Sequence, residues 1–415
     1  MSKISKTYII GAGISGLTAA CYAKHKKQEI EIFEATGQAG GRCRSYYDKA
    51  LNFEIDNGNH LILSANINFI NFCKLIKSEK TLIYYDSKFN FYDLKTDNRW
   101  SIKIPKSRFP WWIFQKENRI PNTTILNYFS ILNFLFCSKN NYVNDLILGS
   151  GRLYKFFWEP LTLGILNTNC KEASAYLLYN VLKKSFLKGG NYCGIIQPNH
   201  NWNETLINPA LNFLKKKRIE INYNNILKKI ETENDLIKKL IFNKKEISIN
   251  KNDRVIMSLS LNGFNKIFPK YSLPNEFNTI VNIHFKVPEK ISLNKKEPIL
   301  GLINSKTHWI FIKKNYISIT ISDANELEGL SSEDLATLVW NEIKRALDLK
   351  KIQIPKYKVL REKKATYKQS PGNINLIKNI NKLPKNLFLA GDWTVSNFPS
   401  TIESSILSGK NSINK

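Results

Sequence analysis

Three glycines and one glutamate near the N-terminus have the spacing of a site that binds a diphosphate and a ribose. Gly11, Gly13 and Gly16 form the pattern Gly-x-Gly-x-x-Gly, and Glu34 follows about 20 residues later. In such a turn the first glycine allows a tight bend, the second lets the backbone approach a pyrophosphate, and the third lets a helix pack closely. The start of that helix offers free N–H groups to the anion. Because an acidic residue accepts from a ribose hydroxyl, Glu34 favours FAD or NAD over NADP.

The residues around this turn predict the elements that hold it. Tyr8-Ile9-Ile10 predicts a short buried strand, residues 17–24 a helix, and residues 30–33 a second strand that ends on Glu34. This order of strand, turn, helix and strand separates a nucleotide fingerprint from a chance glycine-rich turn that binds nothing. The predicted contacts with the nucleotide are Gly11, Gly13, Ile14, Ser15, Gly16 and Glu34.

A second glycine segment follows the first. In Gly40-Gly41-Arg42 the glycine pair lets the backbone close over a cofactor, and the guanidinium can hold phosphate as a fork. NAD-dependent dehydrogenases have no need of this segment. Here the sequence resembles the superfamily of flavin amine oxidases and phytoene desaturases, in which Glu-x-x-x-x-x-Gly-Gly-Arg follows the first βαβ unit. The resemblance implies FAD as the cofactor.

The resemblance also assigns cofactor contacts to segments far from the N-terminus. One segment, Asp-Asn-Gly-Asn-His, is implied to lie near the flavin ring, and one apolar residue after a predicted strand is implied to contact adenine through its backbone. Near the C-terminus, Leu-Ala-Gly-Asp-Trp predicts a strand, a tight turn and a carboxylate that accepts from a cofactor hydroxyl. The helix after it has a free N-terminus that suits the ribityl and pyrophosphate end, and its first residues would face the pyrimidine edge of the flavin. These contacts are Asn57, Gly58, Ile226, Gly391, Asp392, Thr401 and Ile402.

The segment Trp-Glu-Pro-Leu followed by Leu-Asn-Thr, residues 158–168, is not a general feature of flavoproteins. It resembles the squalene-associated branch of the superfamily, the hydroxysqualene dehydroxylases. The resemblance spans the chain, and Asn59, where glutamine is expected, is a small departure from it. Its anchors are GAGISGL, GGRCRS, DNGNHLIL, WEPLTLGILNT, REKKAT and LAGDW…PSTIESS. It implies removal of the hydroxyl of hydroxysqualene to give squalene, in hopanoid or triterpenoid lipid synthesis, with squalene-synthase-like enzymes as pathway partners.

Two side chains are candidates for the polar step of such a reaction. Replacing C–OH by C–H needs a hydride, which reduced flavin supplies, and an acid that protonates the leaving oxygen. His60 and Tyr367 are the catalytic candidates, although a lone histidine is often a structural hydrogen-bonding residue. Glu159 precedes Pro160 and fits a carboxylate at a helix start better than an acid.

Two other kinds of function compete with this interpretation. A carotenoid (phytoene)-type desaturase or an amine oxidase of the same superfamily would use the flavin in the oxidative direction. A non-catalytic flavin-binding lipid carrier or scaffold would keep the cofactor segments without the chemistry. The Trp-Glu-Pro-Leu and Leu-Asn-Thr segments argue against a desaturase, and the intact cofactor segments at both ends of the chain argue against a carrier.

The fold class predicted is α/β, with a Rossmann-like FAD-binding domain of the flavin amine oxidase type and an inserted substrate domain. The FAD-binding domain is discontinuous and takes residues 1–65, 190–262 and 360–415. The substrate domain takes residues 66–189 and 263–359, and combines a β-sheet with a helical lobe that is rich in aromatic residues. Residues 280–287 and 317–321 alternate apolar and polar as half-buried strands do.

Composition bounds the partners of the chain. Its 415 residues carry a formal charge of +28, which fits a solvated lysine-rich surface or attraction to an anionic membrane surface. The lysines are spread out and no reader motif occurs, so nucleic acid is not expected as a partner. The apolar run Phe109-Pro110-Trp111-Trp112 and the apolar residues that follow at helical spacing fit either plain core or a lobe that holds lipid at a bilayer surface.

The same features bound the compartment. The six cysteines have no metal-ligand spacing, so reduced thiols and no metal are expected in a cytoplasmic protein. No run of 18 or more apolar residues occurs. The apolar N-terminus imitates a secretion signal, but the glycine fingerprint inside it argues against one. Together these features predict a cytoplasmic protein that is peripheral on the inner face of the membrane.

Overall fold

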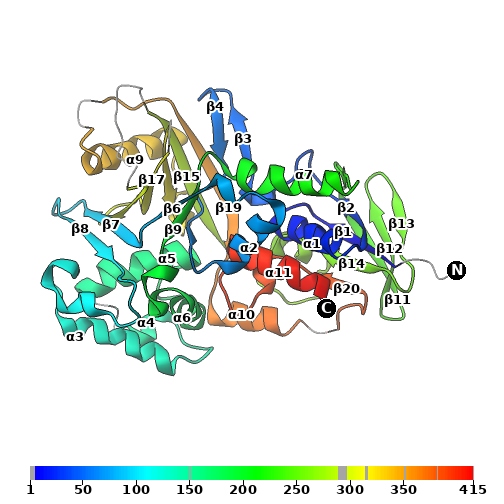
Figure 1. Cartoon of the computed structure of the whole chain (residues 1–415), viewed down its shortest axis with the longest axis horizontal. Coiled ribbons are helices and arrows are strands. Elements are labelled where there is room, and N and C mark those ends of the chain that lie inside the picture. Colours follow the sequence, from blue (N-terminus) through cyan, green and yellow to red (C-terminus); the bar gives the residue numbers. More distant parts are fainter. Residues whose placement is uncertain are drawn as a thin grey trace.

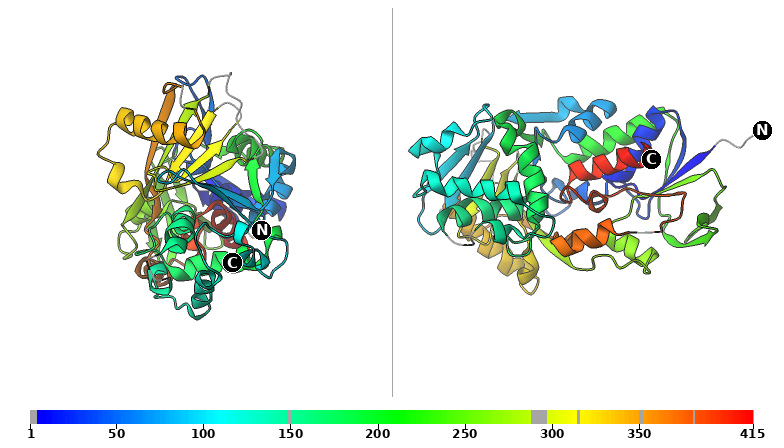
Figure 2. Two further views of the ribbon diagram at one scale, coloured as in Figure 1. Left: turned by 90° about the vertical axis from the view of Figure 1, so that its left-hand side faces the viewer. Right: turned by 90° about the horizontal axis from the view of Figure 1, so that it is seen from below.

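The structure is a computed structural model that describes residues 5–147, 149, 151–287, 297–313, 316–349, 352–380 and 382–414. Two large sheets organise an elongated molecule, and the chain crosses between them several times (Figure 1). The N- and C-terminal ends both lie with the first sheet, and the helical lobe lies at the opposite end, as the two further views also show (Figure 2).

The first sheet is parallel and has the strand order β10-β2-β1-β14-β20. Its strands are short, and the residues that they bury are mostly apolar, because layers cover both of its faces. The strands are β1 (Lys6–Ile10), β2 (Glu29–Phe33), β10 (Ile221–Asn222), β14 (Arg254–Met257) and β20 (Leu387–Leu389). Four helices pack together on one face around Leu17, Phe69 and Trp202. They are α1 (Ile14–His25), α2 (Ile67–Ile76), α7 (Asn208–Lys216) and α11 (Ile402–Asn414).

A β-meander and two short helices pack on the other face of this sheet, around Phe264 and Trp393. These elements are β11 (Leu227–Glu233), β12 (Leu236–Phe242), β13 (Glu246–Ser248), α8 (Leu261–Ile267) and α10 (Pro371–Lys378). The expected strands and helix of the nucleotide turn are thus confirmed. One helix on the first face of this sheet, over residues 203–216, changes its hydrogen-bond pattern along its length. That helix begins as a π-turn, η9 (Asn203–Ile207), and continues as α7.

The second sheet has seven strands in the order β19-β15-β18-β17-β16-β7-β8 and is mostly antiparallel. Its strands are β7 (Lys88–Asp93), β8 (Arg99–Lys103), β15 (Phe277–Lys286), β16 (Ile299–Ile303), β17 (Trp309–Ile312), β18 (Tyr316–Ile321) and β19 (Tyr357–Tyr367). One face packs on η10 (Ala324–Leu327) and α9 (Ser332–Ala346) through Val281, Ile283 and Phe285. Helix α9 is capped at its N-terminus, since the Ser331 side chain accepts from the backbone N of Asp334.

The helical lobe packs against the far end of the second sheet, through the side chains of β7, β8 and β16. It is built from short helices: η3 (Trp111–Phe114), η4 (Lys116–Asn118), α3 (Ile125–Tyr128), η5 (Phe129–Phe136), α4 (Val143–Leu146), η6 (Tyr154–Trp158), α5 (Glu159–Leu166), α6 (Ala175–Lys184), η7 (Phe186–Lys188) and η8 (Gly190–Tyr192). As expected, Glu159 stands at the start of α5 beside Pro160. The apolar run after residue 125 continues mostly as a 3₁₀ helix, so its side chains repeat every three residues.

Smaller elements join the two sheets. The hairpin β3 (Ser45–Asp48) and β4 (Phe53–Asp56) leads into the sheet β5 (Ile62–Leu63), β9 (Ile195–Pro198) and β6 (Leu82–Tyr85), which follows η2 (Glu79–Thr81). The structure differs from two expected domain boundaries. Helix α2 packs in the core of the nucleotide-binding part although it follows residue 65, because Phe69 and Phe72 bury against α1 and α11. Strand β19 crosses the boundary at residue 360, because it pairs with β15 along most of its length.

Candidate active site

The first glycine turn lies between β1 and α1, at the carboxyl end of the central strand. Gly11 has a φ of +102°, and a Cβ there would stand 2.4 Å from the carbonyl oxygen of Ser258. At Gly16 a Cβ would stand 1.9 Å from the carbonyl oxygen of Gly11, so the helix can only begin this close to the strand with glycine. By contrast, no atom lies within 4 Å of a Cβ built on Gly13, whose side of the turn is open.

The N-terminus of α1 has the properties of an anion site. The helix begins at Ile14 with no side-chain cap and no acidic residue in its first turn. Its first N–H groups therefore have no intrahelical acceptor and carry the positive end of the helix dipole. Ile14 and Ser15 are buried, so they can contribute to a nucleotide site chiefly through their backbone.

The second glycine segment lies directly against the first. The backbone N of Gly40 donates to the carbonyl oxygen of Ala12 at 2.9 Å, and Gly13 and Gly40 form an isolated parallel bridge. A Cβ on Gly41 would stand 3.3 Å from the Cα of Gly13. The turn continues into η1 (Gly41–Cys43), which brings Arg42 to the same edge of the sheet.

Glu34 lies at the end of β2 and holds the turn from the side. Its Oε2 accepts from the backbone N of Ala12 at 2.8 Å, and its Oε1 accepts from the backbone and hydroxyl of Thr36 at 2.9 Å each. The loop that carries Ile226 lies beside it, because Asn225 N donates to the carbonyl oxygen of Glu34. The structure thus brings the predicted ribose and adenine residues together.

The peptide groups of Ile226 are themselves engaged. Its N donates to Oδ1 of Asn243 at 2.7 Å, and its carbonyl accepts from Asn243 N at 3.0 Å. A contact to adenine through this backbone, as the resemblance implies, would share or replace these bonds. The side chain of Ile226 is 41% exposed and is the part of the residue that remains available.

Arg42 forms an ion pair with Asp392, which stands 350 residues away in the chain. The distance from Nη2 to Oδ1 is 2.7 Å, and Nη1 donates to the carbonyl oxygen of Ala365 at the end of β19. The charge of Asp392 raises the pKa of Arg42. Arg42 was expected to hold phosphate as a fork, but in this structure the fork joins the second glycine segment to the C-terminal turn.

The C-terminal segment completes the same edge. Gly391 follows β20, and its N donates to the hydroxyl of Ser408 in α11 at 3.0 Å, while Asp392 begins η11 (Asp392–Thr394). The expected free N-terminus of α11 is partly wrong, because the Thr401 hydroxyl accepts from Ser404 N at 3.3 Å. Ile402, the first residue of α11, is buried.

The loop from Asp56 to His60 leads from this edge to the second sheet. Asn57 donates from its side chain to the carbonyl oxygen of Arg42 at 3.3 Å and from its backbone to that of Arg44 at 2.9 Å. Gly58 passes close to the β15 strand, where a Cβ would stand 3.4 Å from Nδ2 of Asn282. His60 follows, with its ring edge-on to Trp202 at 5.7 Å.

The environment of His60 keeps its imidazole neutral near pH 7. Burial, with the charges of Arg42 and Lys313, lowers the pKa of His60 to about 4. Its Nε2 is buried and has no hydrogen-bond partner among the described residues. Tyr367, the other catalytic candidate, lies at the end of β19 in the core around Trp393, and burial raises the pKa of its hydroxyl. The structure therefore does not bring the two candidate side chains into one packed group.

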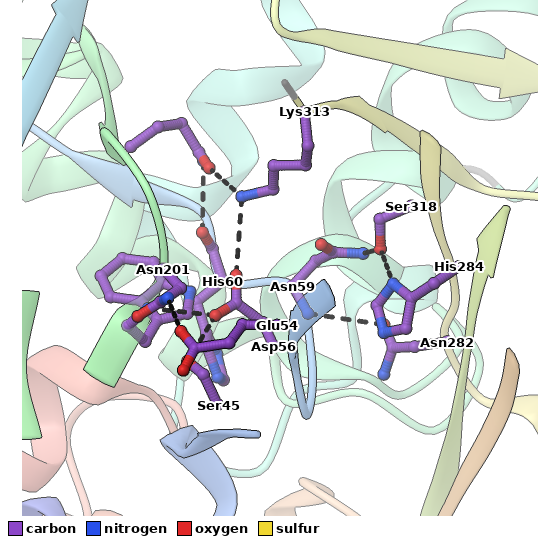
Figure 3. A network of polar contacts seen from close by, with 12 residues as sticks. Ser45, Glu54, Asp56, Asn59, His60, Asn201, Asn282, His284, Lys313 and Ser318 are labelled. Carbon is purple, nitrogen blue, oxygen red and sulfur yellow. Dashed lines mark hydrogen bonds and ion pairs between the residues drawn. The ribbon is translucent and has the colours of Figure 1, made fainter. Parts of the chain in front are cut away.

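A buried polar face of the second sheet meets this loop. β15 and β18 alternate as expected, but their polar side faces loop 57–60 and not solvent. Asn282, His284, Ser318 and Thr320 are all less than a tenth exposed. Asn59 donates from Nδ2 to the hydroxyls of Ser318 and Thr320 at 2.7 and 3.0 Å, and Ser318 contacts Nδ1 of His284 at 2.7 Å (Figure 3).

Lys313 is a largely buried cation of this region, and nothing in its sequence context distinguishes it from the other lysines and arginines, 62 in all. It follows β17 and reaches Oδ2 of Asp56 at 3.8 Å and Oε1 of Gln197 at 3.2 Å (Figure 3). Burial raises the pKa of Asp56 and lowers the pKa of Lys313, while each charge supports the other. Gln197 in turn donates to the carbonyl oxygen of His60 at 3.3 Å.

The Leu-Asn-Thr segment has a structural role. Asn167 has a left-handed backbone (φ 48°), donates to the Asn278 carbonyl and the Thr366 hydroxyl, and accepts from Asp323 N at 2.7 Å. Gln369 donates to the Leu166 carbonyl at 2.6 Å and accepts from Ser400 N at 2.9 Å. These bonds tie α5 to β15, to β19 and to the start of α11. The residues that made this segment distinctive thus hold the two domains together.

These features test whether a flavin dinucleotide suits the site. An open glycine face beside an uncapped helix N-terminus, next to a carboxylate at the end of β2, fits the diphosphate and ribose of such a group. The C-terminal turn closes the same edge through Arg42 and Asp392. The fold and the site therefore define a dinucleotide-binding oxidoreductase whose substrate domain is a separate, mostly antiparallel sheet.

Comparison with known proteins agrees with this class. The family model for flavin containing amine oxidoreductases matches residues 14–412. A hydroxysqualene dehydroxylase from Zymomonas mobilis is 33% identical over 410 residues, covering 98% of both chains. Another from Sinorhizobium fredii is 33% identical over 403 residues, covering 97% of this chain and 96% of its own. The chain belongs to the flavin containing amine oxidoreductase family, and within it to the group of the hydroxysqualene dehydroxylases, as the sequence predicted.

One more distant relative and one solved structure are also similar to this chain. A 15-cis-phytoene desaturase from an Oncidium hybrid cultivar is 21% identical over 468 aligned positions, covering 98% of this chain and 77% of its own. The cyclohexylamine oxidase of Brevibacterium oxydans superimposes with a TM-score of 0.74 at 12% identity, covering 99% and 98% of the two chains, and thus shares the fold. Membership of the family implies a flavin as cofactor. Among the described residues, no helix is both long and apolar enough to cross a membrane, and no group of three or more metal-ligating side chains occurs.

Proposed function

We propose that this chain is an FAD-dependent oxidoreductase that removes the hydroxyl of hydroxysqualene to give squalene, within hopanoid or triterpenoid lipid synthesis. The observation that carries the proposal is the one-third identity, over nearly the whole chain, with proteins named hydroxysqualene dehydroxylase. The continuous edge of cofactor residues supports it. Squalene-synthase-like enzymes, which would deliver the substrate, are the proposed pathway partners.

We propose that the flavin is FAD, because the site has features that suit the adenosine and diphosphate part of FAD as well as features that suit the flavin part. Glu34 stands where a ribose hydroxyl can reach it, and the open face of Gly13 and the first N–H groups of α1 suit a diphosphate. Gly40, Gly41, Asn57, Gly58 and the start of α11 would line the remainder. FMN has a single phosphate and no adenosine ribose, so these features would lack a ligand.

The proposed reaction replaces a C–O bond by a C–H bond and releases water. Reduced flavin, when bound, supplies a hydride. The chain must hold the substrate carbon at the cofactor, exclude water from its apolar surroundings, and provide the proton with which the oxygen leaves. An allylic alcohol ionises to a delocalised cation, and aromatic faces of the substrate domain could stabilise it.

His60 and Tyr367 remain proposals for the polar step, with roles that their surroundings limit. A neutral imidazole with a pKa near 4 can accept or pass a proton but is not a stored acid at pH 7. Tyr367 keeps its proton because its pKa is raised, and it is packed in the core beside Trp393. We therefore assign His60 to orientation or relay of a proton and Tyr367 to support of the C-terminal cofactor turn.

The lobe supports a further part of the proposal, contact with a membrane surface. Leu126, Phe129, Leu132 and Leu135 repeat every three residues along α3 and η5 and form one exposed apolar stripe, which Phe136 extends at 86% exposure. Trp111, 62% exposed, belongs to a second exposed aromatic group with Phe109 and Phe114.

The charge around this stripe is positive. Residues 106–139 contain five lysines and arginines and a single acidic residue, Glu117. Exposed aromatic and leucine side chains with a basic surround fit the interface of an anionic bilayer. We therefore propose a cytoplasmic protein that is peripheral on the inner face of the membrane and takes its C30 isoprenoid substrate from there.

One experiment tests the activity. The purified protein is inspected for a flavin spectrum, reduced anaerobically, and mixed with hydroxysqualene in a single turnover. Reoxidation of the flavin coupled to formation of squalene is expected. Reoxidation without squalene, or a protein that binds FAD but leaves hydroxysqualene unchanged, contradicts the proposal and favours the carrier function. Conversion of phytoene by the oxidised protein would instead identify a desaturase.

A further inference from the structure

Unpaired polar atoms concentrate where loop 56–60 meets the second sheet. Five side-chain atoms there are buried and have no hydrogen-bond partner among the described residues. They are Oδ2 of Asp56, Oδ1 of Asn59, Nε2 of His60, Nε2 of His284 and the hydroxyl of Tyr316. Three of the five have weaker interactions, since Oδ2 of Asp56 faces Lys313 at 3.8 Å and the backbone of Asp56 interacts with His284 and Tyr316. Most buried polar groups in proteins are bonded, so Oδ1 of Asn59 and Nε2 of His60, which lack a partner among the described residues, indicate a site for a polar ligand. We call these residues, with Lys313, the junction cluster.

The junction cluster is held firmly from both sides. On one side, Asp56 Oδ1 accepts from the Ser45 hydroxyl at 2.7 Å and from Trp202 N at 3.0 Å. On the other side, Asn59 donates to Ser318, which contacts Nδ1 of His284 (Figure 3). The rings of His284 and Tyr316 meet edge to face at 5.4 Å. These bonds fix the residues of the cluster and leave Oδ1 of Asn59 and Nε2 of His60 free to meet a ligand.

Lys313 stands out within the cluster because the described residues do not occupy all the donors of its ammonium. It has three N–H donors, of which one meets Gln197 at 3.2 Å and another points to Asp56 at 3.8 Å, an ion-pair distance too long for a hydrogen bond. Burial lowers the pKa of Lys313, which makes its ammonium a better proton donor. The neighbouring groups are poorer donors. His60 and His284 have pKa values of about 4, so near pH 7 neither ring carries the extra proton that it could release as an acid, and the raised pKa of Tyr316 means that its hydroxyl holds its proton more tightly.

The position of the cluster connects it to the proposed reaction. Loop 56–60 is bonded to Arg42 through Asn57, and Arg42 is paired with Asp392 in the cofactor edge. The cluster therefore lies between the residues proposed to hold the flavin and the sheet of the substrate domain. A C30 isoprenoid alcohol is apolar except for one hydroxyl, so one buried polar spot in this region is what its recognition requires.

We propose that the junction cluster binds the hydroxyl of the isoprenoid alcohol and that the ammonium of Lys313 supplies the proton with which that oxygen leaves as water. This inference rests on the proposed function. The C–O bond breaks, an O–H bond forms to complete water, and the carbon takes up the hydride that the proposed function assigns to reduced flavin. Lys313 then regains its proton from solvent. Asp56 and Gln197 position the ammonium, and Arg42, Asp48 and Glu54 are the other charged groups of the surroundings.

Binding of two lipids to the oxidised holoenzyme tests the first half of the proposal without turnover. The ligands are hydroxysqualene and squalene, and binding is followed through the flavin absorbance. The wild-type protein should prefer the alcohol by about 10- to 150-fold, the usual value of a hydrogen bond to a charged group. Lys313→Met should reduce this preference to less than about threefold and leave squalene affinity unchanged. A preference that survives in Lys313→Met overturns the assignment.

Two further variants make the test specific. Lys358→Met is the matched control, because it removes another lysine of the substrate domain, in β19, that pairs with a buried carboxylate, Asp48 of β3, at 3.5 Å. It should keep the preference for the alcohol. If Lys313→Met does not fold because Asp56 is left as an unpaired buried charge, the double variant Asp56→Asn/Lys313→Met is neutral and takes its place.

Lys313→Arg separates binding from proton transfer. Arginine keeps the charge and its donors but does not release a proton in proteins, so the variant should still prefer the alcohol yet lose at least about 100-fold in single-turnover rate. A rate close to wild type would show that Lys313 is not the acid. Failure of the proposed function gives a different result: the wild-type holoenzyme would prefer the alcohol but form no squalene.

Discussion

Replacing Gly13 by alanine separates the demands of folding from those of the cofactor. Gly13 has φ −69° and ψ 179°, which any L-residue adopts, and apart from its own turn no atom of the described residues lies within 4 Å of an added Cβ. The free energy of unfolding of the cofactor-free protein should therefore change by less than about 0.5 kcal/mol. A diphosphate held against this turn would meet the new methyl group. A methyl forced into a close contact costs about 1–3 kcal/mol, so the affinity for FAD should fall by about 5- to 150-fold.

Titration of the apoprotein with FAD, followed by the quenching of flavin fluorescence, measures this affinity, and denaturant unfolding measures stability. Gly16→Ala gives the opposite pattern, because its Cβ would stand 1.9 Å from the carbonyl oxygen of Gly11 and should lower the free energy of unfolding by more than about 2 kcal/mol. Gly372→Ala, in the first turn of α10 with open space around it, is the control that should change neither quantity. Wild-type FAD affinity in Gly13→Ala would refute the placement of the diphosphate.

Three other outcomes are expected. Asn167→Ala should lower the free energy of unfolding by about 2–5 kcal/mol, because it leaves buried groups unpaired and places alanine at a φ of 48°. The control is Asn122→Ala, a surface position with a φ of 60°. A loss below about 1 kcal/mol in Asn167→Ala, or an equal loss in the control, would contradict this. Burial lowers the pKa of His284 to about 4 from 6.5, so the unfolded chain binds a proton that the native state does not bind, and stability should fall as pH falls from 6.5 to 4. The contribution of His284 is roughly 2 kcal/mol at pH 5. Because burial also lowers the pKa of His60 and of His308 to about 4, denaturant unfolding should show a loss in both proteins that is about 2 kcal/mol smaller in His284→Asn than in the wild type, and equal losses would contradict this. Leu126→Ser/Phe136→Ser should weaken binding to vesicles that contain anionic lipid by at least about tenfold without loss of stability. The control Leu330→Ser/Leu376→Ser replaces exposed leucines outside the lobe and should bind as the wild type does. Sedimentation with the vesicles measures the binding, and equal retention of the two variants would argue against the lobe as the contact surface.

The nucleotide turn could be predicted from sequence because its requirements are local. Gly11 and Gly16 are fixed by backbone geometry within one strand, one turn and one helix, so their spacing alone carries the information. The partner of Arg42 could not be predicted, because a guanidinium fork suits a phosphate and a carboxylate equally and Asp392 is 350 residues away. The backbone bonds of Ile226 to Asn243 likewise depend on how the meander folds back.

The alternation of apolar and polar residues predicted strands β15 and β18 of the second sheet, but it did not predict that their polar face would be buried. Alternation in β15 and β18 is the usual mark of a sheet with one wet face, and His284 and Ser318 have the pattern of solvent-facing residues. In the structure that face is covered by loop 57–60, which a period-two pattern cannot show. The pairing of β19 across the predicted boundary at residue 360 could not be read from the sequence either, because a strand joins whichever sheet offers it a partner, and here the partner is β15.

Covering a polar sheet face with a single loop has a physical consequence. The loop from Asp56 to His60 must satisfy polar groups on the sheet through Asn59 and stay attached to the cofactor edge through Asn57. An apolar loop would leave the hydroxyls and amides of β15 and β18 without partners, at a cost of about 1–3 kcal/mol for each group. The same polar loop places unpaired polar atoms, and the carboxylate that pairs with the ammonium of Lys313, in an otherwise apolar domain. One stretch of chain makes both sets of bonds, so the geometries of the cofactor edge and of the junction cluster cannot vary independently. A hydroxyl bound at the junction cluster would therefore keep a fixed position relative to a cofactor bound at that edge.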